Sequence, residues 1–327
     1  MKEQESHAEF EKKWTELMAK LCNETYPAAA KLTLLQSVKD EDITGPMLAI
    51  CARELMRRAL PLDLKGIDVC GTGGDKGVNN IKTFNVSTAV AFVVAAGGVS
   101  VIKHGNRSVS SVSGSSDVLA ALHVPVCTNA AQAKAQHTKH NLCFVSAAAF
   151  HPSLTPLAPV RKALGRPSFL NLIGPLCNPA RTPKQVMGVY GFQPQVAEAA
   201  KRLGRTDMMV VHSADGLDEI SLSDFTQILH VKDGKIEESL ICPEDLGLAT
   251  VPIAKLQGGT AEQNAAIILS VFSGEQGPAN DIICLNAAAA FVTAGKDPDL
   301  KSGLARAQKI IADGLALKKL KDMKSAA

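Results

Sequence analysis

Short apolar runs of strand length alternate with helical segments through the middle of the chain. The apolar runs lie at residues 67–70, 99–102, 124–127, 142–146 and 208–212, and the helical segments at 89–96, 117–122, 129–140 and 194–204. Runs that are apolar throughout are typical of strands buried on both faces, and strands that alternate with helices favour parallel pairing. The pattern therefore predicts an α/β fold with a central, mostly parallel sheet flanked by helices.

The first part of the chain is predicted to be a small helical unit. Residues 8–60 carry apolar positions at helical spacing, broken by Pro27 and by the polar segment 39–45. Three prolines punctuate residues 147–165, which predicts a crossing that returns short helices to this unit. We expect a helical domain at residues 1–64, with a returning segment at about 150–178, and an α/β domain at 65–327.

The last third of the chain continues the alternation. A β-rich piece is predicted at residues 218–233, and three helices follow at about 260–274, 280–294 and 301–315.

Polar residues fall where predicted strands end and helices begin. The glycine-rich turn Gly71-Thr72-Gly73-Gly74-Asp75 follows the first strand, and Asn85, Ser87 and Thr88 precede the next helical run. Glycines let a backbone approach a ligand closely, and the N–H groups of a helix start attract anions. A phosphate site is predicted here, the alternative being a tight turn with helix caps.

A second site of the same kind follows the next strand. It combines Lys103-His104-Gly105-Asn106-Arg107 with serines that precede a further helix, the last of them Ser115 and Ser116. Two such sites indicate a ligand with more than one phosphate. The chain has neither the G-x-x-x-x-G-K-[ST] motif of a P-loop nor the G-x-G-x-x-G motif of a dinucleotide-binding turn.

The acidic pair Asp218-Glu219 is a candidate metal site. Mg²⁺ prefers a few carboxylates completed by water and phosphate oxygens, which suits a pair near a strand end. The alternative is a solvated turn that follows Asp215-Gly216.

Composition narrows the class of protein. The 327 residues are 46% hydrophobic with a net charge of only +3, which makes nucleic acid an unlikely main partner. Eight cysteines without a C-x-x-C spacing favour a reducing compartment and argue against structural zinc. Because no apolar run approaches 18 residues, we expect a soluble, cytoplasmic protein without a membrane segment.

Seven motifs, in order and at the right spacing, resemble one enzyme family over essentially the whole chain. They are GTGGD, TFNVST, KHGNR with VSSVSGSSDVL, HP with PVR, NLIGPLCNPA, DGLDEIS and GGTAEQNA. This combination resembles the anthranilate phosphoribosyltransferases of tryptophan biosynthesis, which have a nucleoside phosphorylase-like fold. The resemblance implies transfer of a phosphoribosyl group from phosphoribosyl pyrophosphate to anthranilate, with Mg²⁺, in a homodimer formed through the N-terminal helices.

The resemblance also implies a set of site residues. For phosphoribosyl pyrophosphate these are Gly71, Gly74, Asp75, Thr83, Asn85, Val86, Ser87, Thr88, Lys103, the stretch from Gly105 and Arg107 through Ser111, and Ser115. The magnesium ligands that the resemblance implies are Ser87, Asp218 and Glu219. Anthranilate recognition falls to Asn106 and Arg161, with His104 and His151 close by. Lys103, His104 and Arg161 are the implied catalytic residues, with His104 hypothesised as the proton acceptor.

The chain departs from the family pattern in three places. The segment 76–82 is about four residues longer than usual, Pro167 replaces an arginine, and Thr155 stands where a longer polar side chain is common. The last two changes lie near the acceptor side. Three alternative functions remain open. They are a phosphoribosyltransferase with a different aromatic amine as acceptor, a pyrimidine nucleoside phosphorylase, and a non-catalytic relative that binds nucleic acid.

Overall fold

Seven strands form one sheet in the part of the chain that the computed structural model describes, residues 6–73, 83–106 and 113–324. The order across the sheet is β3-β2-β1-β4-β5-β6-β7. The strands are β1 Ile67–Gly71, β2 Val101–Gly105, β3 Leu142–Ser146, β4 Lys184–Gly188, β5 Asp207–Ser213, β6 Thr226–Lys232 and β7 Lys235–Ile241. Strands β1 to β5 pair in parallel, and β6 and β7 add an antiparallel edge. The predicted mostly parallel sheet is confirmed.

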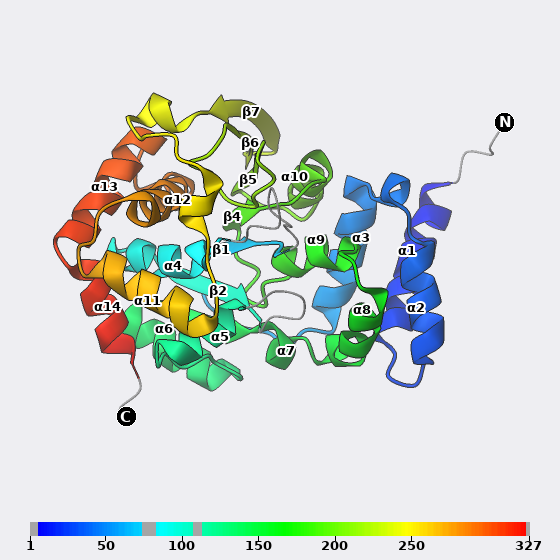
Figure 1. The fold of residues 1–327 in the computed structure, drawn as a ribbon. Helices are drawn as coiled ribbons and strands as arrows, with labels where there is room; N and C mark the ends of the chain where they lie inside the picture. The colour runs from blue at the N-terminus through cyan, green and yellow to red at the C-terminus, as the bar shows by residue number, and fades with distance from the viewer. Residues whose placement is uncertain (1–5, 74–82, 107–112, 325–327) are drawn as a thin grey trace.

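On one face of the sheet α4 and α12 contact the strands, and three further helices of the second half of the chain pack against them (Figure 1). These helices are α4 Val86–Ala96, α11 Ala261–Phe272, α12 Pro278–Ala294, α13 Leu300–Ala312 and α14 Leu315–Met323. Alternate residues of β5 point to the two faces: Met209 and Val211 belong to this core, whereas Met208 and Val210 belong to the opposite one. Both faces are therefore apolar, as the continuous apolar runs predicted.

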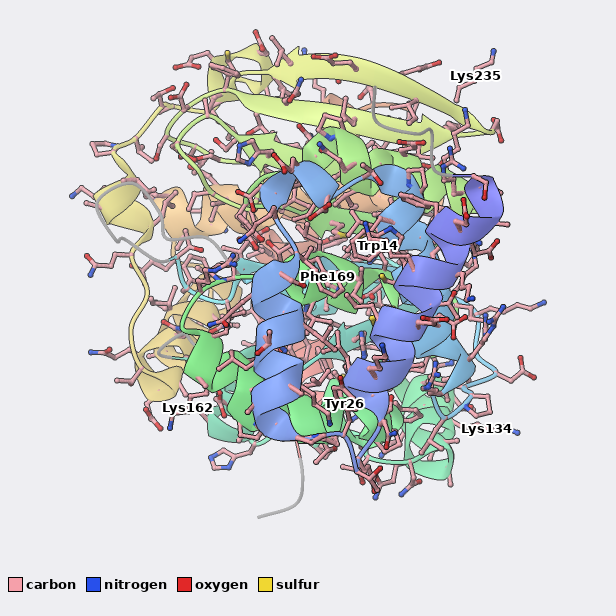
Figure 2. All side chains as sticks on the ribbon, turned by 90° about the vertical axis from the view of Figure 1, so that its right-hand side faces the viewer. Trp14, Tyr26, Lys134, Lys162, Phe169 and Lys235 are labelled. Atoms are coloured by element: carbon pink, nitrogen blue, oxygen red, sulfur yellow. The ribbon has the colours of Figure 1, made fainter. Side chains whose placement is uncertain are left out.

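The other face carries α10 and the helices of the N-terminal part. They are α1 His7–Cys22, α2 Ala28–Ser37, α3 Gly45–Arg57, α8 Ala158–Leu164, α9 Phe169–Leu176 and α10 Gln193–Arg202. Figure 2 looks onto α1 and α2, with Trp14 and Phe169, both fully buried, among the side chains beneath them. Because one hydrophobic cluster joins these helices to Met208 and Val210 of the sheet, the division into domains 1–64 and 65–327 stays a prediction.

Shorter elements complete the described chain. They are α5 Ser115–Ala121, α6 Ala130–His140, α7 Ala147–Phe150 and the 3₁₀ turns η1 Asp40–Asp42, η3 Pro152–Leu157, η4 Pro243–Leu246 and η5 Ile253–Leu256. The prolines of 147–165 thus break this crossing into short pieces, as expected. None of the helices in the described ranges is long and apolar enough to span a membrane.

Three predicted elements differ from the structure. The strand predicted at 124–127 is wrong, since Cys127 makes only an isolated bridge to Val145. The β-rich piece at 218–233 begins only at Thr226, so the acidic pair lies in the loop that leads to β6. A fourth C-terminal helix, α14, was not predicted; Leu320 and Met323 on one side of it are buried beneath a largely charged exterior.

Candidate active site

The site is built where the chain reverses its direction of travel across the sheet. From β1 the chain proceeds outward to β2 and β3, and β4 then lies on the other side of β1 and leads on to β5. Ligands of open α/β sheets bind at the carboxyl ends of strands at such a switch point. Here those ends are Gly71 and Gly188, which pair with each other.

Asp218 fills the space that these two glycines leave, with its backbone at Gly188 and its carboxylate at Gly71. A Cβ on Gly188 would lie 1.5 Å from the Asp218 carbonyl oxygen, and one on Gly71 would lie 2.6 Å from its Oδ2. Any side chain at either position would therefore displace Asp218. The glycines are required by this close approach rather than by a turn.

The Asp218 carboxylate is held by the glycine-rich turn. Its Oδ2 accepts hydrogen bonds from the Gly73 backbone N–H at 2.8 Å and from Thr72 Oγ1 at 3.1 Å. Burial raises the pKa of Asp218, and these two bonds, which favour the charged form, oppose that shift. Glu219 instead lines a small cavity together with Ser87 and Asn286. The acidic pair thus faces both the glycine turn and the start of α4.

Lys103 reaches the same place from the middle of β2, which runs to Gly105 and so extends three residues beyond the predicted strand end at 102. Its side chain is 3% exposed, and Nζ donates to the Val69 carbonyl at 2.5 Å and to Ser87 Oγ at 3.1 Å. Ser87 and Thr88 were predicted to precede this helix, but α4 begins three residues earlier than predicted, at Val86, so both lie in its first turn. The N–H groups of Val86 and Thr88 donate to Phe84 and Asn85. Because these two N–H groups are already bonded, the positive charge available to an anion at this helix start comes mainly from Lys103 and the helix dipole.

Asn85 connects this helix start to two other segments. Its Nδ2 donates to the Ser113 carbonyl at 3.3 Å, and its Oδ1 accepts from Asn264 Nδ2 at 2.9 Å. Asn264 in turn accepts from the Gly259 N–H at 2.7 Å. Thr83 forms an isolated bridge with Gln257 in the same region. Asn264 was not predicted as a site residue, although it lies in the GGTAEQNA motif that carried the resemblance.

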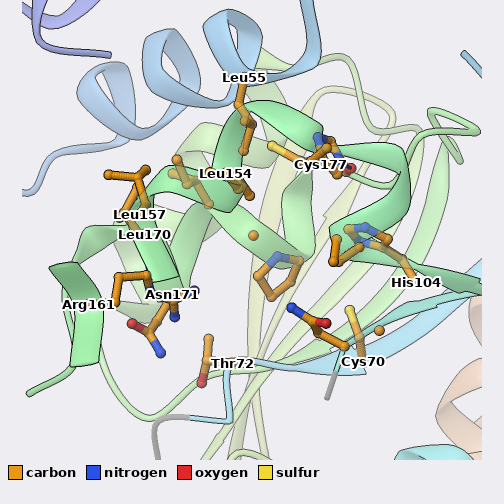
Figure 3. Close-up of a pocket in the computed structure, with 18 of the residues that line it drawn as sticks. Leu55, Cys70, Thr72, His104, Leu154, Leu157, Arg161, Leu170, Asn171 and Cys177 are labelled. Atoms are coloured by element: carbon orange, nitrogen blue, oxygen red, sulfur yellow. Dashed lines mark hydrogen bonds between the residues drawn. The ribbon is translucent and has the colours of Figure 1, made fainter. Parts of the chain in front are cut away.

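A cavity of about 300 Å³ opens beside these loops. Its polar lining residues are Thr72, His104, Asn106, His151, Thr155, Arg161 and Asn171. Its apolar lining includes Leu55, Leu154, Leu157, Leu170 and Ile173, and Figure 3 shows Leu157 and Leu170 beside Arg161 and Asn171. A mostly apolar cavity with a few converging polar groups is the usual form of a small-molecule site.

Arg161 supplies a cation to this cavity. It projects from α8, and Figure 3 shows it beside Asn171 of α9. Burial lowers the pKa of the Arg161 guanidinium, but an arginine stays charged in any ordinary environment. A half-buried guanidinium in an apolar cavity is well placed to bind a carboxylate through two parallel hydrogen bonds.

Two histidines meet at the inner wall of the cavity. The ring centroids of His104 and His151 are 5.2 Å apart. Burial lowers the pKa of His104 to about 3, with smaller contributions from His151 and Lys103, and burial also lowers the pKa of His151. Both rings are therefore neutral at physiological pH.

A buried carboxylate beneath the histidines was missed. Asp68 is fully buried on β1. Its carboxylate accepts hydrogen bonds from the backbone N–H of His104 at 3.3 Å and from Asn178 Nδ2 at 2.8 Å. Asn178 also donates to the Ile102 carbonyl at 2.8 Å. Burial raises the pKa of Asp68, and Lys103 opposes that shift. The sequence signal that could have identified Asp68 is its position as the single charged residue in an otherwise apolar strand.

The remaining predicted residues fall into two groups. Ser115 lies beside the cavity, where its Oγ donates to the Asn106 carbonyl at 3.2 Å and sits within 2.3 Å of a Cβ placed on Gly105. Gly74, Asp75, Arg107 and Ser111, and the long segment 76–82, lie outside the described residues. The described residues contain no cluster of three or more acidic, histidine or cysteine side chains. A metal bound by Asp218 or Glu219 would therefore need further ligands such as water or phosphate oxygens.

Comparison with known proteins decides the family. A family profile described as "Glycosyl transferase family, a/b domain" matches residues 64–317. The anthranilate phosphoribosyltransferase of Clostridium kluyveri is 40% identical over 316 residues, which cover 94% of this chain and 92% of the relative. The chain belongs to the anthranilate phosphoribosyltransferase family.

Solved structures of the family agree in fold. The enzyme from Thermus thermophilus is 36% identical with a TM-score of 0.86, over 96% of this chain and 94% of that one. The Saccharomyces cerevisiae enzyme, whose structure was determined with phosphoribosyl pyrophosphate and Mg, is 26% identical with a TM-score of 0.84, over 98% of this chain and 93% of that one.

Proposed function

We propose that this protein transfers the phosphoribosyl group of phosphoribosyl pyrophosphate to the amine of anthranilate. The products are N-(5-phosphoribosyl)anthranilate and pyrophosphate. The observation that carries the proposal is that two half-sites share one cavity: Thr72 and Gly71 of the glycine turn line the same cavity as Arg161 and Asn171. A donor held at the turn thus meets an acceptor held in the cavity.

The donor half uses the residues at the switch point. Lys103, held at the α4 start by Ser87, is placed to neutralise phosphate charge, together with Asn85 and the backbone of the glycine turn. The predicted donor contacts at Thr83, Val86, Thr88, Gly105 and Ser115 belong to this proposal.

Magnesium fits the oxygen donors present. The buried Asp218 carboxylate lies at the glycine turn, and Glu219 and Ser87 face one small cavity. Carboxylate and hydroxyl oxygens are the ligands that Mg²⁺ prefers. When bound, the ion would supply positive charge to the pyrophosphate group. The yeast relative's structure with phosphoribosyl pyrophosphate and Mg supports the use of this ion.

The reaction requires no covalent bond between the protein and the substrates. The bond between the ribose C1 and the pyrophosphate oxygen breaks, and a bond from C1 to the amine nitrogen forms. The site must stabilise the departing charge and hold the amine in line with C1.

The acceptor half recognises a carboxylate and an aromatic ring. Arg161 would pair with the anthranilate carboxylate, while Leu154, Leu157 and Leu170 would contact the ring. A structure of the yeast relative with 4-fluoroanthranilate supports this class of acceptor. Asn106, His104 and His151 complete this half.

One observation keeps a related acceptor in view. Thr155, which stands where a longer polar side chain is common in the family, lines the cavity on the acceptor side. Pro167, in contrast, lies just outside α9, before its N-cap Ser168. An aromatic amine that is bulkier than anthranilate is therefore the second candidate acceptor.

The acceptor assignment is tested by substituting Arg161. Loss of a charge-assisted, bidentate bond of about 1.5–3 kcal/mol predicts that Arg161→Ala raises the KM for anthranilate by roughly tenfold or more, with the KM for phosphoribosyl pyrophosphate within about twofold. Lys162→Ala, on the same helix but exposed, is the matched control and should behave like the parent protein. Equal effects of both substitutions would contradict the assignment.

A further inference from the structure

The two histidines at the inner wall of the cavity each keep one ring nitrogen without a partner. His104 lies near the end of β2 and His151 follows α7, and both rings are buried. Among the residues that the structure describes, His104 Nε2 and His151 Nδ1 have no hydrogen-bond partner. Buried polar atoms are nearly always paired, so two such atoms on neighbouring rings need an explanation.

The tautomer of His151 follows from its other nitrogen. His151 Nε2 lies 2.7 Å from the carbonyl oxygen of Cys177. A carbonyl only accepts, so Nε2 must carry the hydrogen. In a neutral imidazole the second nitrogen then bears a lone pair, which makes His151 Nδ1 an acceptor.

The neighbouring ring can supply the missing donor. The centroids are 5.2 Å apart and the ring planes are inclined by 59°. Neighbouring rings at this separation can bring Nε2–H of His104 to Nδ1 of His151, and catalytic hydrogen bonds are often looser before substrate binds. Burial keeps both rings neutral, as this bond requires.

We propose that His151 is a positioning residue that fixes His104 as the tautomer with hydrogen on Nε2, so that the lone pair of His104 Nδ1 accepts the proton of the acceptor's amine. The inference rests on the proposed function and deepens it. It gives the two histidines different tasks, since only His104 meets the reacting group.

The proton balance is simple. The amine nitrogen bonds to C1 as the C1–O bond breaks, and pyrophosphate leaves with the bonding electron pair. The nitrogen becomes cationic and passes its proton to His104 Nδ1, which later releases it to water. An aryl-substituted ammonium is a strong acid, so a weakly basic imidazole suffices.

The backbone beneath the rings supports this arrangement. Asn178 follows the carbonyl that holds His151, and its side chain donates to Asp68 at 2.8 Å. Asp68 also accepts the backbone N–H of His104 at 3.3 Å. The anchors of both rings are thus joined through one buried carboxylate, which sets the distance between them.

The test combines a tautomer measurement with kinetics. In protein labelled with ¹⁵N-histidine, the protonated and bare ring nitrogens are distinguished by NMR. We expect His104 in the parent protein to carry hydrogen on Nε2, and to become a mixture of tautomers in His151→Phe. We also expect His151→Phe to lower kcat with anthranilate by tenfold or more, with the KM for phosphoribosyl pyrophosphate within about twofold.

Three further variants make the test specific. In the double variant His104→Phe/His151→Phe, kcat should equal that of His104→Phe alone, because His151 acts only through His104. His151→Asn places an amide oxygen near the position of Nδ1 and should restore the His104 tautomer and part of kcat. His137→Phe is the control: its ring bonds to Ser100, before the opposite end of β2, and kcat should not change.

The outcomes separate the two proposals. An unchanged His104 tautomer or an unchanged kcat in His151→Phe overturns the role of His151. If His151→Phe does not fold, loss of the His104 tautomer in His151→Asn overturns it instead. If the parent protein consumes no anthranilate, the proposed function fails, and the tautomer measurement still decides whether His151 orients His104.

Discussion

The carbonyl oxygen of Asp218 lies 1.5 Å from the position that a Cβ on Gly188 would occupy. The last residue of β4 thus sits directly against the loop that carries the acidic pair, at the point where the sheet changes its winding direction. This contact places a carboxylate at the glycine turn between two parallel strands.

Gly188→Ala should disrupt the donor half of the site. The methyl group must push the Asp218 backbone away, at a cost of about 1–3 kcal/mol in the free energy of unfolding. We expect a lower melting temperature and a KM for phosphoribosyl pyrophosphate raised at least severalfold. Gly191→Ala, whose Cβ would meet no atom within 4 Å, is the nearby control. Parent-like stability and KM in Gly188→Ala would show that the loop can yield freely.

Asn264→Ala should weaken donor binding without touching the acceptor cavity. The substitution removes the bond to Asn85 at 2.9 Å and leaves the Gly259 N–H without its acceptor. Loss of such a partner costs about 1–3 kcal/mol. Calorimetry should show weaker binding of phosphoribosyl pyrophosphate, with the KM for anthranilate nearly unchanged. Glu262→Gln, exposed on the same helix, serves as the control; a Kd in Asn264→Ala equal to the control's would contradict the role of Asn264.

Asp218→Asn should weaken the dependence of donor binding on magnesium. The change keeps the size of the side chain but removes the charge that the Gly73 and Thr72 donors hold in place. In calorimetric titrations, Mg²⁺ should strengthen binding of phosphoribosyl pyrophosphate in the parent protein and much less in the variant. Asp224→Asn, exposed in the same loop, should retain the full effect of Mg²⁺. An equal effect in both variants would remove Asp218 from the metal site.

The buried histidines should make the fold sensitive to acid. The folded-state pKa of His104 is about 3, below its value of 6.5 in an unfolded chain, so the unfolded state binds more protons between these two values. The contribution of His104 to the free energy of unfolding is therefore complete above pH 6.5, and it is lost as the pH drops toward 3. Each such proton contributes about 1.4 kcal/mol per pH unit to the slope. His104→Phe should give a shallower slope in urea unfolding between pH 7 and 5; an identical slope would contradict burial of a neutral ring.

Much of the fold was predictable because its signals are local. The apolar runs of β1, β3 and β5 and the helical spacing of α1 and α3 depend on neighbouring residues, and these elements lie where they were predicted. The run at 124–127 failed because an apolar composition does not supply a strand to pair with; only Cys127 reaches β3.

The sequence predicted which segments form the site. It did not predict which side chains in those segments bond to one another. The sequence shows Lys103 near a strand end and Ser87 near a helix start, although the structure places Lys103 within β2 and Ser87 within the first turn of α4. The Asp68–Asn178 pair joins residues 110 positions apart, and Asn85–Asn264 joins residues 179 positions apart. Such partners depend on the register of the sheet, which no local pattern contains.

Loss of anthranilate fluorescence is the most direct test of the proposed reaction. The purified protein is mixed with anthranilate, phosphoribosyl pyrophosphate and Mg²⁺, with and without EDTA, and the product is identified by mass spectrometry. We predict rapid loss of fluorescence that EDTA abolishes and that Asp218→Ala/Glu219→Ala cannot support, with N-(5-phosphoribosyl)anthranilate as the product. Unchanged fluorescence, despite calorimetric binding of phosphoribosyl pyrophosphate, would contradict anthranilate as the acceptor and direct the search to bulkier aromatic amines.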